Sequence, residues 1–178
     1  MESLDRPLYA SATSNILSAQ PAFSTGSPRI FLRLGQLLLS VVPEGAGSQL
    51  IEFSYLVDDD SRSIKAELAV PLVEKVAPSA PYAHVLPSDP ELFARSGTVC
   101  AGCHAREERV PSIDFATAYS SVAYRPNPSY QVSLDALAQA QKSCDPIVQP
   151  QRCAMLAALF GHGSVMQAEF PKTMALFN

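Results

Sequence analysis

The sequence has no long apolar run and no excess of basic residues, and each absence excludes a class of function. The longest mainly apolar stretch, 37–42, is far shorter than the roughly 20 residues that a membrane-spanning helix needs. The 178 residues include 13 Lys and Arg against 17 Asp and Glu, which gives a net charge of −4. No basic patch for nucleic acid is therefore expected, and no membrane span is expected in this chain.

Motifs of several enzyme and export classes are also missing. The chain has no Gly-rich phosphate loop, no EF-hand loop, and no ordered Ser, His and Asp typical of hydrolases. The acidic run at 58–60 is expected to be a solvated turn rather than a calcium site. Residues 1–28 lack a cationic start and an apolar h-region, so we expect a native export signal to be absent from this chain. These absences remove the signatures of several common enzyme classes.

The composition is that of an ordinary folded protein. Hydrophobic residues make up 47% of the chain and charged residues 17%, which is enough to build a core. The character of the sequence changes twice, so we expect three regions. These are an N-terminal surface arm at 1–28, a β-rich region with a Pro-rich connector at 29–87, and a helical region at 88–178.

Alternating apolar residues predict a β meander in the second region. Alternating residues at 30–34 continue into a buried-looking run at 37–42, a second strand is expected at 50–57 and a third at 64–70, with turns at 43–47 and 58–61, so we expect at least three strands. The third region has helix signals. Asp89 and Pro90 favour a helix start, Ser133 a cap, Gly161 a helix end, and Ser164 a capping box with Gln167. The expected fold is therefore α+β, with a small antiparallel meander followed by a mainly helical half.

One short motif indicates a specific chemistry. Cys100, Cys103 and His104 form a Cys-x-x-Cys-His sequence, in a chain that has only four cysteines and three histidines. This is the attachment signature of c-type haem, in which two thiols one turn apart add to the porphyrin vinyl groups and the histidine ligates the iron. The motif predicts haem c as the cofactor and electron transfer as the function.

The segment 88–105, which contains LFARSGTVCAGCH at 92–104, resembles the start of a class I cytochrome c, where a short helix with an aromatic residue leads into the motif. The resemblance implies thioether bonds at Cys100 and Cys103, His104 as the proximal ligand, and a helical haem-binding fold. It ends after His104, because residues 105–109 replace the Gly-rich stretch of that family and no Pro-x-Met occurs.

The distal haem ligand is left open by the sequence. A methionine would raise the reduction potential and a histidine would lower it, and a five-coordinate iron is a further alternative. Met155 lies in an apolar helical pattern that favours core packing. The candidates are Met166, His162, Met155, His84 and Met174.

The remaining cysteines allow several interpretations. Cys144 and Cys153 bracket a short loop and favour a disulfide, which would fit an extracytoplasmic compartment such as the periplasm or the cell surface. Four thiolates could instead bind zinc, or Cys100 and Cys103 could form a disulfide or a redox pair. The alternative function is thus an exported, disulfide-stapled interaction or scaffold protein with a haemless or metal-binding motif. Expected partners are a redox protein or a surface-associated protein, for which the N-terminal β region is a candidate docking module.

Overall fold

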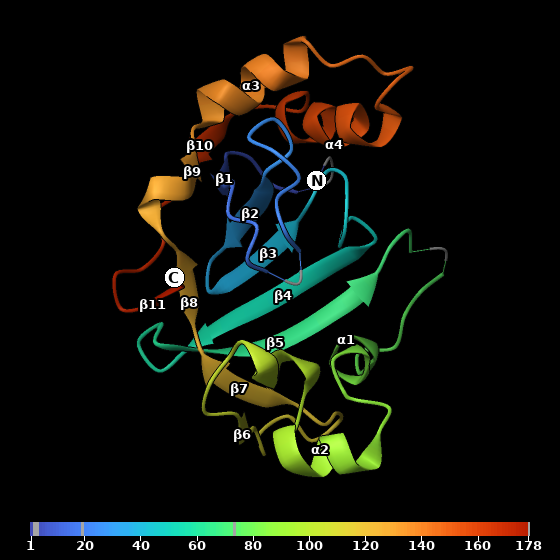
Figure 1. Ribbon diagram of the computed structural model, residues 1–178, viewed down its shortest axis with the longest axis vertical. Helices are drawn as coiled ribbons and strands as arrows, with labels where there is room; N and C mark the ends of the chain where they lie inside the picture. The colour runs from blue at the N-terminus through green and yellow to red at the C-terminus, as the bar shows by residue number, and fades with distance from the viewer. Residues whose placement is uncertain (2–3, 19, 73, 178) are drawn as a thin grey trace.

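The computed structural model describes residues 1, 4–18, 20–72 and 74–177, and most of the strands among them form one large sheet (Figure 1). The sheet has nine strands in the order β10-β1-β2-β3-β4-β5-β7-β6, and β9 also pairs with β1. The neighbouring pairs are antiparallel except for the parallel pair of β1 and β10. The strands of this sheet are β1 (Leu8–Thr13), β2 (Arg29–Leu34), β3 (Leu37–Val41), β4 (Leu50–Val57), β5 (Arg62–Ala69), β6 (Glu108–Arg109), β7 (Tyr119–Val122), β9 (Gln131–Val132) and β10 (Val165–Gln167).

The predicted meander is present and has four strands, because the first expected stretch divides into the antiparallel pair β2 and β3. Consecutive strands pair in antiparallel register, with Leu32 opposite Leu39 and Phe53 opposite Ala66. The β2–β3 turn contains Gly35 at a φ of 63°, a conformation that glycine adopts without strain. The three residues Asp58, Asp59 and Asp60 that join β4 to β5 all have positive φ, which short polar side chains tolerate better than most.

The mainly helical half expected at 88–178 is wrong. Helix accounts for 23% of the structure and strand for 30%, and the region contributes six strands but only three α-helices. The helices are α1 (Ala80–His84), α2 (Pro90–Ser96), α3 (Leu134–Lys142) and α4 (Pro150–Phe160), with 3-10 turns η1 (Val99–Gly102) and η2 (Pro128–Tyr130). The segment expected to be a last helix is β10, because Val165 to Gln167 pair with β1. A local capping signal is overridden there by pairing with a distant strand.

The surface arm expected at the N-terminus is also wrong for Leu8–Thr13. This segment is β1, which lies inside the sheet between β2 and β10. Leu8, Ala10 and Ala12 are no more than 3% exposed. Their small side chains alternate with polar ones, so the strand periodicity was hidden in a Ser- and Ala-rich stretch.

Two of the predicted helix starts are confirmed, because the expected capping residues form their hydrogen bonds. The Asp89 carboxylate accepts a hydrogen bond from the Glu91 backbone N–H, and the Ser133 hydroxyl accepts one from the Ala136 N–H. Both helices are short, and α3 packs with α4 against β1 and β2 at one end of the molecule (Figure 1). The core between these layers contains Leu8, Ala10, Ala12, Ile30, Leu32, Val132, Leu137, Leu156 and Leu159.

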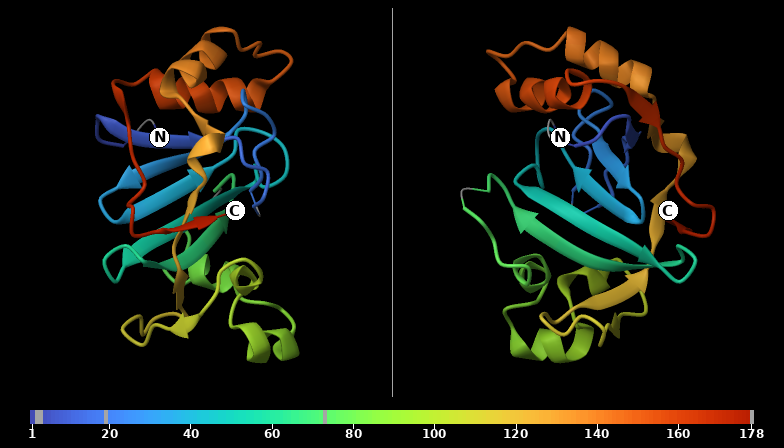
Figure 2. Two further views of the ribbon diagram at one scale, coloured as in Figure 1. Left: turned by 60° about the vertical axis from the view of Figure 1, so that its left-hand side comes forward. Right: turned by 180° about the vertical axis from the view of Figure 1, so that it is seen from behind.

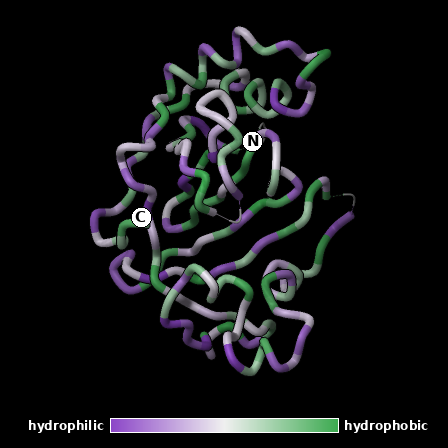
Figure 3. The backbone as a smooth tube through the Cα atoms, viewed as in Figure 1, coloured by the Kyte–Doolittle hydropathy of each residue, from purple (hydrophilic) through white to green (hydrophobic). Residues whose placement is uncertain are grey.

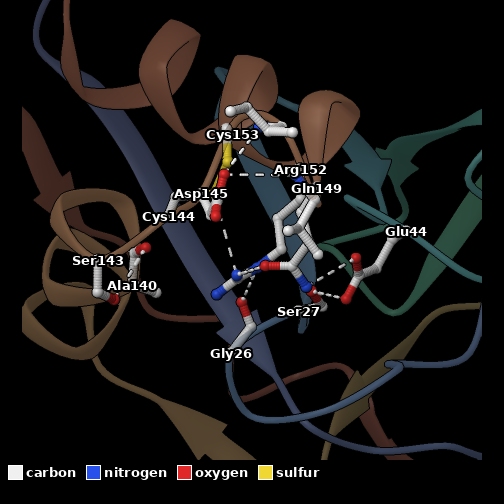
Figure 4. Close-up of a disulfide and its surroundings, with 12 residues drawn as sticks. Gly26, Ser27, Glu44, Ala140, Ser143, Cys144, Asp145, Gln149, Arg152 and Cys153 are labelled. Carbon is white, nitrogen blue, oxygen red and sulfur yellow. Dashed lines mark hydrogen bonds between the residues drawn. A yellow bond between two sulfur atoms is a disulfide. The ribbon is translucent and has the colours of Figure 1, made fainter.

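The predicted disulfide between Cys144 and Cys153 is present and joins the end of α3 to α4 (Figure 4). Arg152 secures the same corner, since its Nε donates to the Gly26 carbonyl at 2.9 Å and its Nη1 to the Gln149 side chain at 2.7 Å. The loop is thereby held to the β1–β2 connection.

A second, two-stranded sheet pairs β8 (Tyr124–Pro126) with β11 (Ala175–Phe177) in parallel. Figure 2 shows β8 beside the main sheet, at an angle to the main strands. Along β4 and β5, hydrophilic and hydrophobic residues are interleaved (Figure 3), so each of these strands has a polar row. In the described part of the chain, no helix is long and apolar enough to cross a membrane.

Candidate functional site

The Cys-x-x-Cys-His motif folds into a single tight turn. Cys100 lies in η1, and its carbonyl accepts hydrogen bonds from the backbone N–H of Cys103 at 3.0 Å and of His104 at 2.8 Å. The Val99 N–H donates to the Val85 carbonyl at 2.9 Å, which ties the turn to the segment after α1. The two thiols and the imidazole therefore come from one rigid turn.

A buried clamp holds the start of this turn. Thr98 is 2% exposed, and its hydroxyl accepts from the Cys100 N–H at 3.0 Å while donating to the Glu107 carboxylate. The second Glu107 oxygen accepts from the Thr98 N–H at 2.8 Å. Gly97 precedes the clamp at a φ of 73°, where a Cβ atom would lie 2.8 Å from Glu107 and 3.0 Å from the Tyr119 ring. Only glycine fits this approach without strain.

His104 is held as a neutral imidazole with one nitrogen available as an acceptor. Its Nδ1 lies 2.9 Å from the Val122 carbonyl. Because a carbonyl can only accept, Nδ1 carries the proton and Nε2 keeps its lone pair. Burial, helped by the Lys65 ammonium and opposed by the Val122 bond, lowers the pKa of His104 to about 4. This tautomer, oriented by a backbone carbonyl, is the form in which histidine ligates metals.

The two motif cysteines are free thiols with different surroundings. Cys103 is exposed, whereas Cys100 is partly buried. Burial raises the pKa of Cys100 to about 11, against the opposing effects of the Thr98 hydrogen bond and the Lys65 charge. Cys100 is therefore a protonated thiol at neutral pH.

The motif forms part of the wall of a cavity of about 180 Å³ between the main sheet and the β8–β11 sheet. Cys100, Cys103 and His104 all line it, so the structure brings the three predicted residues to one space. His104 packs on Tyr124 with ring centroids 5.2 Å apart, and Tyr124 packs on Phe177 at 5.5 Å. The apolar lining includes Phe31, Leu38, Phe53, Val85, Val99, Tyr124, Phe170, Met174 and Phe177.

The floor of the cavity is the polar row of the meander. Arg29 forms an ion pair with Glu52 at 2.6 Å, and the Lys65 ammonium donates to the Ser54 hydroxyl at 2.8 Å. The second oxygen of Glu52 is buried without a hydrogen-bond partner among the described residues. Burial, with a smaller effect of Arg29, lowers the pKa of Lys65 to about 8, while the Cys100 thiol and Glu52 act in the opposite direction. Charged groups gathered at a cavity with shifted pKa values are typical of functional sites.

The five candidates for a distal ligand are placed very differently. Met174 is 4% exposed and lines the cavity together with His104. The other four do not line it: Met166 lies on β10, Met155 in α4, His162 after α4, and His84 against Glu67 at 2.7 Å.

Comparison of the chain with protein-family models, with curated proteins and with solved structures finds no match in any of the three. The resemblance to class I cytochrome c is wrong. That family is helical, whereas this motif lies against an antiparallel sheet. The likeness covers only the segment 88–105 around one turn, and unrelated folds can contain such a turn.

A zinc site built from all four cysteines is excluded, because Cys144 and Cys153 are bonded to each other. In the described part of the chain, no group of three or more His, Cys, Asp and Glu side chains is placed to hold a metal ion. A haem iron needs only one or two protein ligands, so this finding bears on ion sites alone.

Sequence reasoning missed the polar floor, chiefly Arg29, Glu52 and Lys65. Their signal is the alternation of charged and apolar residues along the strands, which also describes an ordinary meander with one face in water. Only the position of β8, β11 and the motif turn over this face shows that the charged row lines a cavity.

Proposed function

We propose that the chain holds one haem covalently through Cys100 and Cys103, with His104 as axial ligand, and that it transfers electrons. The observation that carries the proposal is that both free thiols and a neutral imidazole with a free Nε2 line the same cavity. The fold that would hold the haem is a β-sheet cavity rather than a cytochrome c helix bundle.

The chemistry of the cavity fits a porphyrin. Its lining contains three cationic side chains (Arg29, Lys65, Arg125) and two carboxylates (Glu52, Glu67), a net charge of +1 in a chain of −4. Aromatic and aliphatic side chains supply the apolar part, as a macrocycle with two carboxylates requires. The volume of about 180 Å³ is below the roughly 300–1,000 Å³ of typical ligand pockets, so a porphyrin would extend through the open side of the cavity.

A haem c supplies a one-electron iron couple when it is bound. The protein residues would determine its position and surroundings. Cys100 and Cys103 anchor it at one edge, His104 presents Nε2 from a ring fixed by Val122, and the Tyr124 ring holds that imidazole in place. The cavity reaches the surface at Cys103 and Val99, which are both exposed. This opening is where a redox partner protein would come close.

We further propose an extracytoplasmic location, in the periplasm or at the cell surface. The disulfide between Cys144 and Cys153 supports an oxidising compartment. Attachment of haem c also takes place outside the cytoplasm. The partner would be a redox protein or a surface-associated protein.

The proposal is tested by a visible spectrum of protein exported together with the haem-attachment machinery. We expect a Soret band, sharp α and β bands after reduction with dithionite, and an intact mass increased by one haem. The colour should remain with the denatured chain, because thioether bonds survive unfolding. A colourless sample with the mass of the bare chain would refute the proposal.

Matched histidine variants test the axial ligand. His104→Gln should retain the covalent mass but alter the Soret position and the reduction potential, since Nε2 is replaced by a poor ligand. His162→Gln is the control, because His162 does not line the cavity. Equal spectra for His104→Gln and the unaltered protein would exclude His104 as the ligand.

The second candidate is an exported interaction or scaffold protein whose motif carries no haem. The observation in its favour is the disulfide-closed loop, where Ile147 is 90% exposed and Val148 is 73% exposed. Exposed aliphatic side chains on a constrained loop are typical of contact surfaces. A colourless exported protein that retains the disulfide would favour this function.

A further inference from the structure

The polar floor of the cavity contains a cation without a carboxylate partner. Lys65 donates to the Ser54 hydroxyl at 2.8 Å, and no carboxylate of the described residues lies within ion-pair distance of its ammonium. An ammonium has three N–H bonds, so two are left without a protein acceptor in the described part of the chain. Lys65 lines the cavity, which makes that space the natural place for an acceptor.

Each neighbouring carboxylate on the floor contacts a side chain other than Lys65. Glu52 is paired with Arg29 at 2.6 Å, and Glu67 accepts from His84 at 2.7 Å. The Ser54 hydroxyl is directed to Ser63 at 3.5 Å, so Ser54 serves as an acceptor that positions the lysine. The floor thus presents one ammonium whose charge is not matched by a paired carboxylate.

We propose that Lys65 forms an anion-binding subsite on the floor of this cavity, where its ammonium takes a carboxylate or a small anion. The subsite extends the proposed haem function, on which it rests. The anion has two possible sources, which are a propionate of the bound porphyrin and a separate small anion that enters the cavity. The Glu52 oxygen that has no hydrogen-bond partner carries negative charge and would repel an anion beside it. The anion would therefore lie on the side of Lys65 away from Glu52.

The first arm of the test uses the full chain made without haem attachment and titrated with zinc protoporphyrin or its dimethyl ester. If Lys65 binds a propionate, Lys65→Met should weaken binding of the diacid about tenfold to a hundredfold, the usual effect of a charge-assisted hydrogen bond. Binding of the ester should not change, and Lys65→Arg should retain most of the affinity for the diacid. Lys142→Met is the matched control, because Lys142 is exposed on α3 and outside the cavity.

The second arm needs no porphyrin. The pKa of Lys65 is followed by NMR of lysine labelled at Cε, and the signal is assigned by its loss in Lys65→Met. The other charged groups, thiols and imidazole that line the cavity are those of Arg29, Glu52, Glu67, Cys100, Cys103, His104 and Arg125. Acetate should raise the pKa of Lys65 from about 8, since an anion stabilises the ammonium. The pKa of Lys142 in the same sample measures the general effect of salt. Acetamide, the uncharged analogue of acetate, is the control for effects that do not depend on charge.

The outcomes separate the two proposals. If Lys65→Met weakens binding of the diacid but not of the ester, the anion is a porphyrin carboxylate. If the only effect is a rise in the pKa of Lys65 with acetate, the anion is a separate molecule. The visible spectrum of the exported protein decides the proposed function, and the acetate arm tests the subsite without any porphyrin. The subsite is refuted if Lys65→Met affects binding of the diacid and the ester equally and acetate leaves the pKa of Lys65 unchanged.

Discussion

The residues of the site differ in solvent exposure, and this difference has measurable consequences. Cys100 and Cys103 are only three positions apart, yet one is partly buried beside the cavity and the other is exposed. His104 and Lys65 are each held in a less charged form than they would have in water. The burial that shifts these groups also costs free energy of folding.

The two free thiols should react at different rates in the folded chain. With a pKa of about 11, Cys100 is a thiolate in about one molecule in a thousand at pH 8. Since the thiolate is the nucleophile, Cys103 should be alkylated by iodoacetamide at least about tenfold faster. Peptide mass spectrometry of timed samples measures both rates. Urea-unfolded protein is the control, and equal rates in the folded chain would contradict the burial of Cys100.

Replacing Lys65 should stabilise the haem-free chain at neutral pH. The pKa of Lys65 is lowered from 10.5 to about 8 in the fold, so below pH 8 the folded chain must keep a poorly solvated ammonium. This costs about 3 kcal/mol, a penalty that fades as the pH rises from 8 to 10.5, where only the unfolded chain still binds the proton. Lys65→Met should therefore be more stable at pH 7 by up to this amount.

Urea unfolding of Lys65→Met and the unaltered chain at pH 7 and pH 10 checks this expectation. The stability difference should shrink at pH 10. Both proteins should also carry Cys100→Ser, because the raised pKa of Cys100 lowers stability between about pH 9 and 11 and itself depends on the Lys65 charge. A difference that stays constant with pH would show that packing, rather than charge, accounts for it.

Among the elements, the motif turn depends most on a few polar contacts. It is a 3-10 turn of four residues, too short to be stable by itself. Its position is set by three contacts. Thr98 bonds to Glu107, the Val99 N–H bonds to the segment after α1, and the His104 ring bonds to β7. Three separate elements must be in place before the thiols and the imidazole meet.

Removing the Thr98 hydroxyl should loosen this turn. Thr98→Val keeps the shape but leaves the Cys100 N–H and one Glu107 oxygen without their partner. We expect a loss of about 1–2 kcal/mol in the free energy of unfolding, together with weaker porphyrin binding. Urea unfolding and a porphyrin titration measure the two effects. Thr117→Val is the control, because the Thr117 hydroxyl has no hydrogen bond among the described residues, and an equal loss there would refute the clamp.

At the scale of the molecule, the disulfide and the cavity lie in different parts. The bond joins α3 to α4, and no described residue of either helix lines the cavity. The apolar core of β1 and β2 packs on α3 and α4, whereas the polar row of β4 and β5 lines the cavity together with the motif. Figure 1 shows α3 and α4 at the end of the molecule opposite to α1 and α2. Stability and binding should therefore respond separately.

Removing the disulfide should lower stability and spare the site. The double variant Cys144→Ser, Cys153→Ser opens a loop with a sequence separation of 9, which should cost about 2–3 kcal/mol by the loss of chain constraint. Porphyrin affinity below the unfolding temperature should change less than about twofold. Thermal unfolding and a titration at 20 °C measure these quantities. A large loss of affinity would show that α3 and α4 support the cavity after all.

The sequence by itself determined the local features of this protein. The alternation of β2 to β5, the caps at Asp89 and Ser133, the Cys144–Cys153 bond and the motif turn depend on residues close together in the chain, whose preferences are visible in a single sequence. Tertiary structure decided the rest. Leu8–Thr13 became a strand because it pairs with β2, β9 and β10, and Val165–Gln167 became one because it pairs with Leu8–Ala10 at the far end of the sequence. Lys65 and Glu52 became parts of a site because distant segments close over their side of the sheet. Such pairing depends on long-range hydrogen bonds and packing, which no local pattern encodes.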